Sequence, residues 1–328
     1  MHLGVDGGNT KTVALVAASD GTILGAGRGG PSDIYATETE SAAVDAVAAA
    51  VNAALNSAMI RRDDLASAAF GMAGADWPED FRLLHDAFAA HGWTDDPLIV
   101  NDAIGALRAA SPDGYGVALV AGTGMAIAAR SPEGGVWHSS HWPTAGGGSG
   151  LGEAALDAIF QAHLGAAPET SLTRRALDLL DQPSVEAILY DITARGRRRW
   201  VVADYARLAP IVLDEACAGD PVAEGIVAEV GRRLARHAAA AADRVGLDME
   251  CFTLALAGGT FRHRGTCYLS AIVGALAEEL PCITPIVSDL EPVAGAVMLA
   301  MERVGVEITP ERRARIAGTM PPPALFAT

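Results

Sequence analysis

The sequence predicts an α/β protein that is built from two similar halves. A motif of strand, glycine-containing loop and strand occurs twice, about 115 residues apart, with its loops at Gly7-Gly8 and Gly122-Thr123-Gly124. Such a repeat indicates an internal duplication. In each half, segments with apolar residues at helical spacing follow the strands. The chain has 328 residues, a length that suits two domains.

The first half is predicted to alternate short strands with amphipathic helices. Apolar runs flank the first loop, and the turn signal Ser19-Asp20-Gly21-Thr22 introduces a third strand. The remaining elements of this half are a helix over about 39–57, a strand over 66–70, a helix over 79–91, a short strand over 98–100 and a helix over 103–109.

The second half is predicted to begin after the turn signal Ser111-Pro112-Asp113-Gly114. A glycine tract at residues 145–152 opens a helix, and the N–H groups at a helix start favour an anion. The expected elements are strands over 116–121 and 125–129, mostly helices over 154–245, a strand over 252–257, a helix over 268–280, a strand over 283–287 and a helix over 293–304.

Composition and charge exclude some classes of function. The 40 acidic residues outnumber the 24 lysines and arginines, and the formal net charge of -16 argues against general binding of nucleic acid. No apolar run approaches the roughly 20 residues that a membrane helix needs. Met1-His2 leads directly into the first strand, so we expect no signal peptide. A phosphorylated ligand stays compatible with the acidic balance, because local loops can override net charge.

The four cysteines are spread along the second half. They have no C-x-x-C spacing, which predicts neither a zinc site nor a disulfide framework. We therefore expect reduced thiols and a cytoplasmic enzyme. The cysteines are Cys217, Cys251, Cys267 and Cys282.

The first loop has the features of a phosphate site. Gly7-Gly8 leaves backbone N–H groups uncovered, and Thr10 and Lys11 add side-chain donors. A carboxylate at Asp6 would repel a bare phosphate but suits a metal-bound water, and magnesium usually keeps several waters. The alternative is an ordinary β-hairpin with a glycine-rich turn.

Two further features each allow two interpretations. Asp102 stands between a strand and a helix, where it would either cap the helix or act as a general base. The run Arg195-Gly196-Arg197-Arg198-Arg199-Trp200 is either a solvated surface or a contact for an anionic ligand or partner.

Five loops, taken together and in order, resemble those of the actin-like sugar kinase and heat-shock-protein ATPase superfamily. Within it, the chain resembles the N-acetylglucosamine kinase group, which is placed with the BadF/BadG/BcrA/BcrD ATPases. The five segments are residues 6–12, 71–75, 101–103, 121–124 and 257–261.

The resemblance implies two ribonuclease-H-like domains around a central cleft. The first, residues 1–112, would carry the sugar side and the first phosphate loop, and the second, residues 113–304, would bind most of the nucleotide. A C-terminal helix at about 305–328 would pack back on the first domain.

The implied activity is transfer of phosphate from ATP, with Mg²⁺, to a hydroxyl of an amino sugar such as N-acetylglucosamine or glucosamine, or of a related hexose. Asp102 would be the general base, and Asp6 would orient the hydrated metal. The expected ATP-binding residues are Gly7, Gly8, Asn9, Thr10, Lys11, Gly122, Thr123, Gly124, Gly258, Gly259 and Thr260. The expected substrate-binding residues are Ser32, Asp33, Ala73, Gly74, Asn101, Asp102, Gly147 and Glu153.

The sequence departs from the resembled pattern on the sugar side. Gly147 stands where these kinases usually have Trp, Glu153 where they have Asp, and Asp33 where Asn is frequent. A carboxylate at position 33 would pair with an ammonium group, so we expect a substrate with a free amine. The nucleotide loops match the pattern without such changes.

Two other functions are compatible with the same superfamily. One is an ATPase activator of a 2-hydroxyacyl-CoA dehydratase, which would need cysteine thiolates for an iron–sulfur cluster, although residues 114–160 contain no cysteine. The other is a catalytically inactive nucleotide- or sugar-binding protein. The expected partner is a small-molecule sugar, without nucleic acid or membrane, and the apolar helices of the second half are compatible with a homodimer.

Overall fold

Two five-stranded sheets with matching strand orders form the framework of the protein. The structure is a computed structural model that describes residues 1–142, 144, 146–247, 251–280 and 282–327. The first sheet has the order β3-β2-β1-β4-β5 and the second the order β10-β9-β6-β7-β8. Counted from the first strand of each half, both orders read 3-2-1-4-5, which confirms the predicted duplication. The strands are β1 His2–Gly7, β2 Thr12–Ala17, β3 Ile23–Gly29, β4 Ser67–Met72, β5 Leu98–Asn101, β6 Gly116–Ala121, β7 Met125–Arg130, β8 Val136–His138, β9 Phe252–Ala257 and β10 Ile283–Val287.

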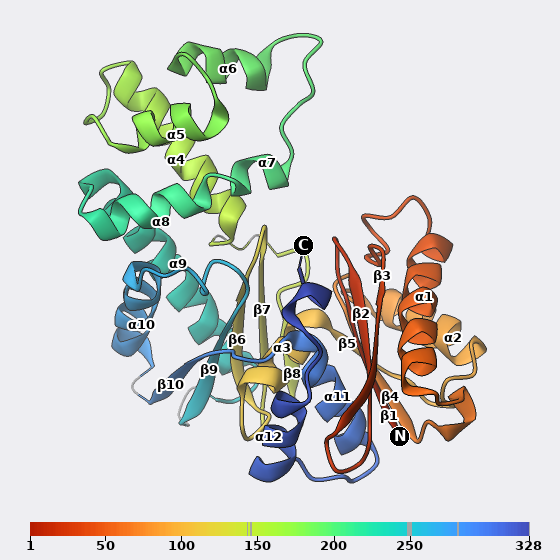
Figure 1. The fold of residues 1–328 in the computed structure, drawn as a ribbon. Coiled ribbons are helices and arrows are strands. Elements are labelled where there is room, and N and C mark those ends of the chain that lie inside the picture. The colour runs from red at the N-terminus through yellow and green to blue at the C-terminus, as the bar shows by residue number, and fades with distance from the viewer. Residues whose placement is uncertain (143, 145, 248–250, 281, 328) are drawn as a thin grey trace. The chain divides into compact units, whose positions relative to one another are not determined.

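The helices follow the predicted segments, with additional short helices in the second half (Figure 1). They are α1 Glu40–Ala58, α2 Pro78–Ala90, α3 Asp102–Ala110, α4 Gly148–His163, α5 Leu172–Leu180, α6 Val185–Thr193, α7 Val202–Ala206, α8 Ala209–Ala218, α9 Pro221–Arg244, α10 Cys267–Glu279, α11 Pro292–Arg303 and α12 Pro310–Gly318, with 3₁₀ turns at Arg62–Asp64 and Pro323–Leu325.

The chain divides into two compact units. Unit 1 contains Met1–Ala118, Ala128–Trp142 and Ser288–Thr328, and unit 2 contains Leu119–Ile127 and Pro143–Val287. Helix α11, which the sequence places in the second domain, therefore belongs to unit 1. It packs there against α3 and against strands β1 and β4.

The sheet of unit 1 is covered on both faces, and the alternation along β2 shows this directly. Ala14 and Val16 lie in the core beneath α1, whereas Val13 and Leu15 lie in the core beneath α11. Successive residues of a strand point to opposite faces, so a strand with both faces buried reads as an unbroken apolar run. Strands β1 and β4 pair in parallel, as do β4 and β5, so their carboxyl ends reach one edge of the sheet.

The C-terminal segment is fastened to the first hairpin of unit 1. Ile316 of α12 is fully buried in the core beneath α11, and Arg315 pairs with Asp20 at 3.0 Å. Further along the chain, the Lys11 ammonium donates a hydrogen bond to the carbonyl of Phe326. The first loop and the C-terminal segment are therefore neighbours within this unit.

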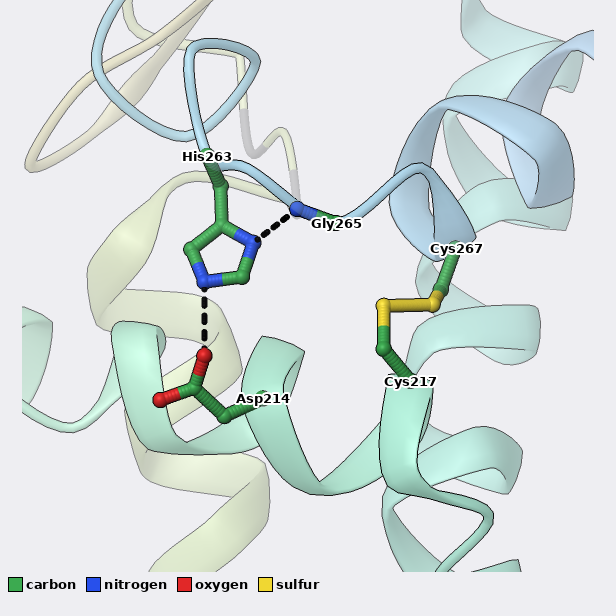
Figure 2. The surroundings of a disulfide bond; sticks show 5 residues. All are labelled: Asp214, Cys217, His263, Gly265 and Cys267. Atoms are coloured by element: carbon green, nitrogen blue, oxygen red, sulfur yellow. Dashed lines mark hydrogen bonds and ion pairs between the residues drawn. A yellow bond between two sulfur atoms is a disulfide. The ribbon is translucent and has the colours of Figure 1, made fainter.

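Unit 2 contains two disulfide bonds, so the expectation of reduced thiols is wrong. Cys217 pairs with Cys267 (Figure 2), and Cys251 pairs with Cys282. The Cα atoms are 5.7 and 4.7 Å apart, within the range for disulfides. The partners are 50 and 31 residues apart in sequence, and only the fold brings them together.

Loss of the disulfides should measurably destabilise unit 2. A variant with all four cysteines changed to serine should lose about 2–4 kcal/mol of unfolding free energy per bond, because each bond restricts the unfolded chain. Denaturant titration with and without dithiothreitol measures this loss. The reductant should destabilise the native protein and leave the serine variant unchanged, whereas four reactive thiols in the untreated native protein would contradict the pairing.

Within the described residues, no helix combines the length and the apolar character that crossing a membrane requires.

Candidate active site

The first phosphate loop, residues 7–11, joins β1 to β2 in unit 1. The Gly8 N–H donates to the carbonyl of Lys11 at 3.0 Å, which closes the turn. The carbonyl of Gly8 accepts from the N–H of Ser32 at 3.0 Å, which fixes the loop to the next connection. Asn9 and Thr10 are exposed at its tip. The Gly8 N–H, which was expected to be uncovered, is therefore used within the loop, and Asn9 and Thr10 are the predicted donors that are exposed.

Ser32 and Asp33 have partners within the protein. Ser32 is fully buried, and the Thr12 hydroxyl lies 2.7 Å from its Oγ. Asp33 is 8% exposed, and its Oδ1 accepts from the N–H of Tyr35 at 2.9 Å. A Cβ at Gly74 would lie 2.8 Å from the same oxygen, so glycine there leaves room for the Asp33 carboxylate. Both segments expected on the sugar side are thus packed together.

The N-cap of α3 is Asn101, so the interpretation of Asp102 as the cap is not supported. Asn101 Oδ1 accepts from the N–H of Ala103 at 3.2 Å, and its Nδ2 donates to Asp76 Oδ1 at 3.2 Å. Asp102 is the first residue of the helix and is half-buried at the end of β5. Because Asn101 supplies the cap, the Asp102 carboxylate is available for another role.

Burial and neighbouring carboxylates weaken the acidity of two aspartates. Desolvation, with the charges of Asp76 and Asp33, raises the pKa of Asp102 to about 6, although the Ala103 N–H opposes this shift. Desolvation, followed by the charges of Asp102 and Glu291, raises the pKa of Asp6 to about 7. The carboxyl groups of Asp6 and Asp102 therefore interact with each other.

The structure adds two residues that were not expected at the site. Asp76 follows β4 and is half-buried, and desolvation raises its pKa while the charge of His141 lowers it. His141 Nε2 lies 3.3 Å from Asp76 Oδ2, and its ring lies against those of Tyr35 and Trp77. Asp76 stands at a strand end after a glycine-containing loop, a signal that could have identified it. His141 has no comparable sequence signal.

The second phosphate loop, residues 122–124, is held by the start of α4 in unit 2. The N–H of Gly148 donates to the Gly122 carbonyl at 2.8 Å, and the N–H of Ser149 donates to the Thr123 carbonyl at 2.9 Å. All three loop residues are exposed. The loop therefore has its carbonyls fixed and its outer surface open.

Gly147 and Glu153 differ in their surroundings. A Cβ at Gly147 would lie 2.2 Å from the carbonyl oxygen of Gly124, so no larger residue fits this backbone. Glu153 lies on α4 and is exposed.

The expected adenosine loop, residues 258–260, is joined to the end of β6. Gly258 has a φ of +97°, and a Cβ there would lie 2.3 Å from the Ala121 carbonyl oxygen. The N–H of Thr260 donates to the same carbonyl at 3.1 Å. This loop therefore starts beside the second phosphate loop in the same unit.

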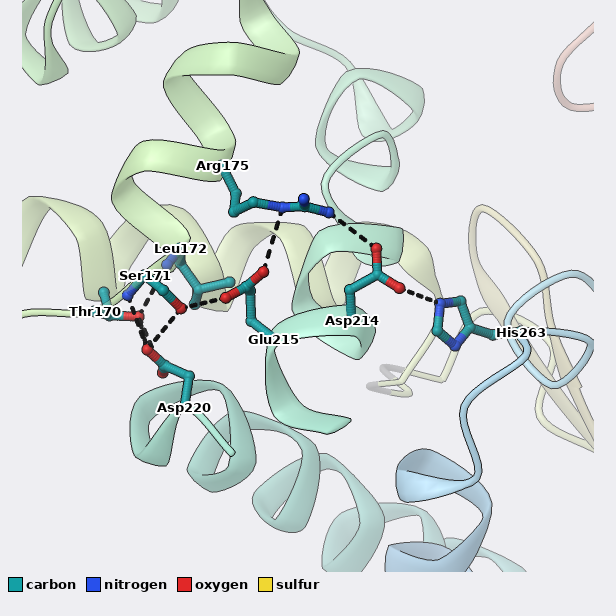
Figure 3. Close-up of polar contacts among 8 residues, drawn as sticks. All are labelled: Thr170, Ser171, Leu172, Arg175, Asp214, Glu215, Asp220 and His263. Carbon is teal, nitrogen blue, oxygen red and sulfur yellow. Dashed lines mark hydrogen bonds and ion pairs between the residues drawn. The ribbon is translucent and has the colours of Figure 1, made fainter. Parts of the chain in front are cut away.

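The segment after the adenosine loop is fastened to α8. His263 Nε2 lies 3.0 Å from Asp214 Oδ1, and its Nδ1 accepts from the N–H of Gly265 at 3.0 Å (Figure 2). Asp214 also pairs with Arg175 at 3.0 Å, which extends the network to α5 (Figure 3). The Cys217–Cys267 bond adds a covalent link a few residues further on.

The residues of unit 1 fit a hydrated magnesium ion. No group of three or more metal-ligating side chains gathers in the part of the chain that the structure describes. Magnesium is commonly bound by one or two carboxylates and keeps several waters. Asp6 meets this requirement, because a cation beside it would relieve its repulsion with Asp102 and Glu291.

Two sheets of the same strand order, each with a glycine-containing loop between its first two strands, match the fold of the actin-like sugar kinases. The chain belongs to the BadF/BadG/BcrA/BcrD ATPase family, whose family model matches residues 3–300. The resemblance inferred from the five loops is thereby confirmed.

Known relatives agree with this placement. The chain is 28% identical to N-acetyl-D-glucosamine kinase from Dictyostelium discoideum, over 92% of this chain and 98% of the relative. It is 25% identical to N-acetylmuramic acid/N-acetylglucosamine kinase from Clostridium acetobutylicum, over 80% of this chain and 85% of the relative. A solved structure from Chromobacterium violaceum, described as a candidate N-acetylglucosamine kinase, has a TM-score of 0.66 and 24% identity, with 91% and 98% covered. At 24% identity, the similarity to this solved structure supports the fold alone.

The dehydratase-activator alternative is not favoured. All four cysteines are paired in disulfides, so none is a free thiolate for an iron–sulfur cluster.

Proposed function

We propose that this chain is an ATP-dependent kinase that phosphorylates a hydroxyl of an amino sugar. The curated relatives are named for N-acetylglucosamine and N-acetylmuramic acid. The proposal includes a sugar-side lobe that contains the first phosphate loop and a nucleotide lobe that contains the second phosphate loop and the adenosine loop.

The observation that carries the proposal is the Asp102 carboxylate. It stands at the end of β5, it is not needed as the helix cap, and its pKa is raised to about 6. A carboxylate with this pKa is ionised near neutral pH and is a stronger base than an ordinary aspartate. Asp102 would accept the proton of the attacking sugar hydroxyl while the phosphoryl group is transferred.

The remaining roles concern the nucleotide. The outer parts of residues 7–11 and 122–124 would hold the phosphates, while the Gly8 and Gly122 N–H groups close their own loops. The Lys11 ammonium would exchange its hydrogen bond to the Phe326 carbonyl for one to a phosphate oxygen, and residues 258–260 would contact the adenosine. Asp6 would orient the waters of a bound magnesium ion, which neutralises phosphate charge when present. Phosphoryl transfer needs positioning and charge neutralisation above all, and these groups supply both.

A coupled assay of ADP release over hexoses and amino sugars tests the proposal. We expect ADP release with at least one amino sugar and little release without an acceptor. Release that does not depend on any sugar would indicate an ATPase. The absence of release with the whole panel, together with binding of ATP, would favour an inactive binding protein.

Asp33 should set the preference for a free amine. Its carboxylate would form an ion pair with the ammonium of glucosamine, whereas an asparagine at this position would form a hydrogen bond to the acetamido group of N-acetylglucosamine. We expect Asp33→Asn to lower the ratio of kcat/KM for glucosamine to that for N-acetylglucosamine by about 10-fold or more. A native protein that strongly prefers N-acetylglucosamine would contradict this assignment, and the Tm of the variant controls for folding.

A further inference from the structure

A loop rich in arginine lies in unit 2 and contains none of the residues assigned above. It comprises residues 195–200 and connects α6 to α7 (Figure 1). Four of its six residues are arginine, in a chain with a net charge of -16. Sequence alone leaves two interpretations open, a solvated surface or a contact for an anion.

The loop lines an open cavity of about 700 Å³. This volume is within the usual range for small-molecule sites, roughly 300–1,000 Å³. Three of the four arginines line it, while the fourth has a structural partner. The lining residues are Ile192, Thr193, Ala194, Arg195, Gly196, Arg197, Arg199, Trp200 and Tyr205.

The fourth arginine, Arg198, holds the loop in place and does not line the cavity. Arg198 binds Asp204 Oδ1 at 2.5 Å, and Asp204 Oδ2 accepts from the N–H of Val201 at 2.8 Å. This pair anchors the loop to the start of α7. Arg198 therefore has a structural role, and Arg195, Arg197 and Arg199 are the arginines that line the cavity.

The three cavity arginines are only weakly balanced by acidic groups. The nearest carboxylate to Arg197 is that of Asp191 at 3.9 Å, and Asp191 also accepts from Trp200 Nε1 at 3.3 Å. Arg195 and Arg199 have no ion pair within the described residues. All three side chains are exposed, so their guanidinium groups are accessible to an anion from solvent.

An aromatic wall completes the cavity. The rings of Trp200 and Tyr205 are 5.3 Å apart at 69°, an edge-to-face arrangement, and both residues are half-buried. The two rings offer apolar surface beside the charged groups. The combination matches a ligand with a negatively charged end and a ring.

We propose that this cavity binds a small phosphorylated molecule. Guanidinium groups form bidentate hydrogen bonds to phosphate oxygens, and a doubly charged phosphate suits several of them at once. None of the lining residues is among those assigned above to the nucleotide or to the sugar. Its ligand would contact Tyr205, whose backbone carbonyl packs on Gly152 of α4.

Isothermal titration calorimetry with inorganic pyrophosphate as the titrant tests the site. The titration is done with saturating magnesium and a non-hydrolysable ATP analogue, so that any nucleotide site is filled. We expect saturable binding to the native protein and at least about 10-fold weaker binding to the variant R195Q/R197Q/R199Q. The matched control is R232Q/R233Q/R236Q, which removes the same charge from exposed positions of α9 and should bind as the native protein does.

Three outcomes would overturn the proposal. They are no saturable binding to the native protein, equal binding to all three proteins, and equal loss in both triple variants, which would indicate a general charge effect. If the triple variant fails to fold, the single variant Arg199→Gln replaces it, with Arg233→Gln as its control. Because binding is measured without turnover, the result does not depend on whether the chain is a kinase.

Discussion

Replacement of Asp102 by asparagine should reduce kcat by at least about 100-fold, because a positioned general base contributes roughly 10²–10⁴-fold to a rate. Asparagine has nearly the same shape and accepts no proton at neutral pH. The α3 cap should survive, since Asn101 supplies it. Coupled ADP release with the best acceptor from the sugar panel measures the effect, and the KM for ATP should change little.

The pH profile of the native protein gives a second readout of the same residue. The base must be ionised, so kcat/KM should rise as the pH increases through about 6, the value to which burial and neighbouring charges raise the pKa of Asp102. Asp76→Asn removes one of those charges, so the rising limb should shift to lower pH. The control Asp178→Asn makes the same chemical change at an exposed position of α5. Near-normal turnover in Asp102→Asn would exclude it as the base.

The expected function-bearing loops of unit 1 could be placed from sequence because they stand at strand ends. Asp6 lies near the end of β1 and Asp102 follows β5, and the parallel pairing of β1, β4 and β5 brings these ends to one edge of a sheet. The duplication was visible for the same reason, since both copies keep a glycine-containing loop between their first two strands. Local pattern and topology point to the same answer in these segments.

Other features depend on contacts that no local pattern records. The cysteine pairs join positions 50 and 31 residues apart, and their spacing resembles no framework. His141 reaches Asp76 from a distant part of unit 1. The sequence left open whether Asp102 caps α3, because Asn and Asp are almost equally good caps and only the hydrogen bond identifies Asn101 as the cap.

At Gly147 the sequence shows a glycine, but only the structure shows what excludes a side chain there. Its replacement is the second substitution for which we expect a large effect. Its backbone angles, φ -73° and ψ 175°, are open to any residue, so sequence rules for glycine do not explain it. What excludes a side chain is the Gly124 carbonyl, which a Cβ would meet at 2.2 Å. An alanine must therefore push the second phosphate loop away from the start of α4.

Gly147→Ala should raise the KM for ATP by about 10-fold or more and lower the unfolding free energy by about 1–3 kcal/mol, the usual cost of overpacking. The backbone bonds from Gly148 and Ser149 to the loop carbonyls would lengthen as the loop moves. Steady-state kinetics in ATP and denaturant titration measure the two effects. The matched control is Gly150→Ala, three residues along, where a Cβ would meet nothing within 4 Å. That change should be neutral or slightly stabilising, because alanine favours a helix over glycine. If Gly147→Ala kept a native KM for ATP and native stability, the second phosphate loop would not depend on this contact.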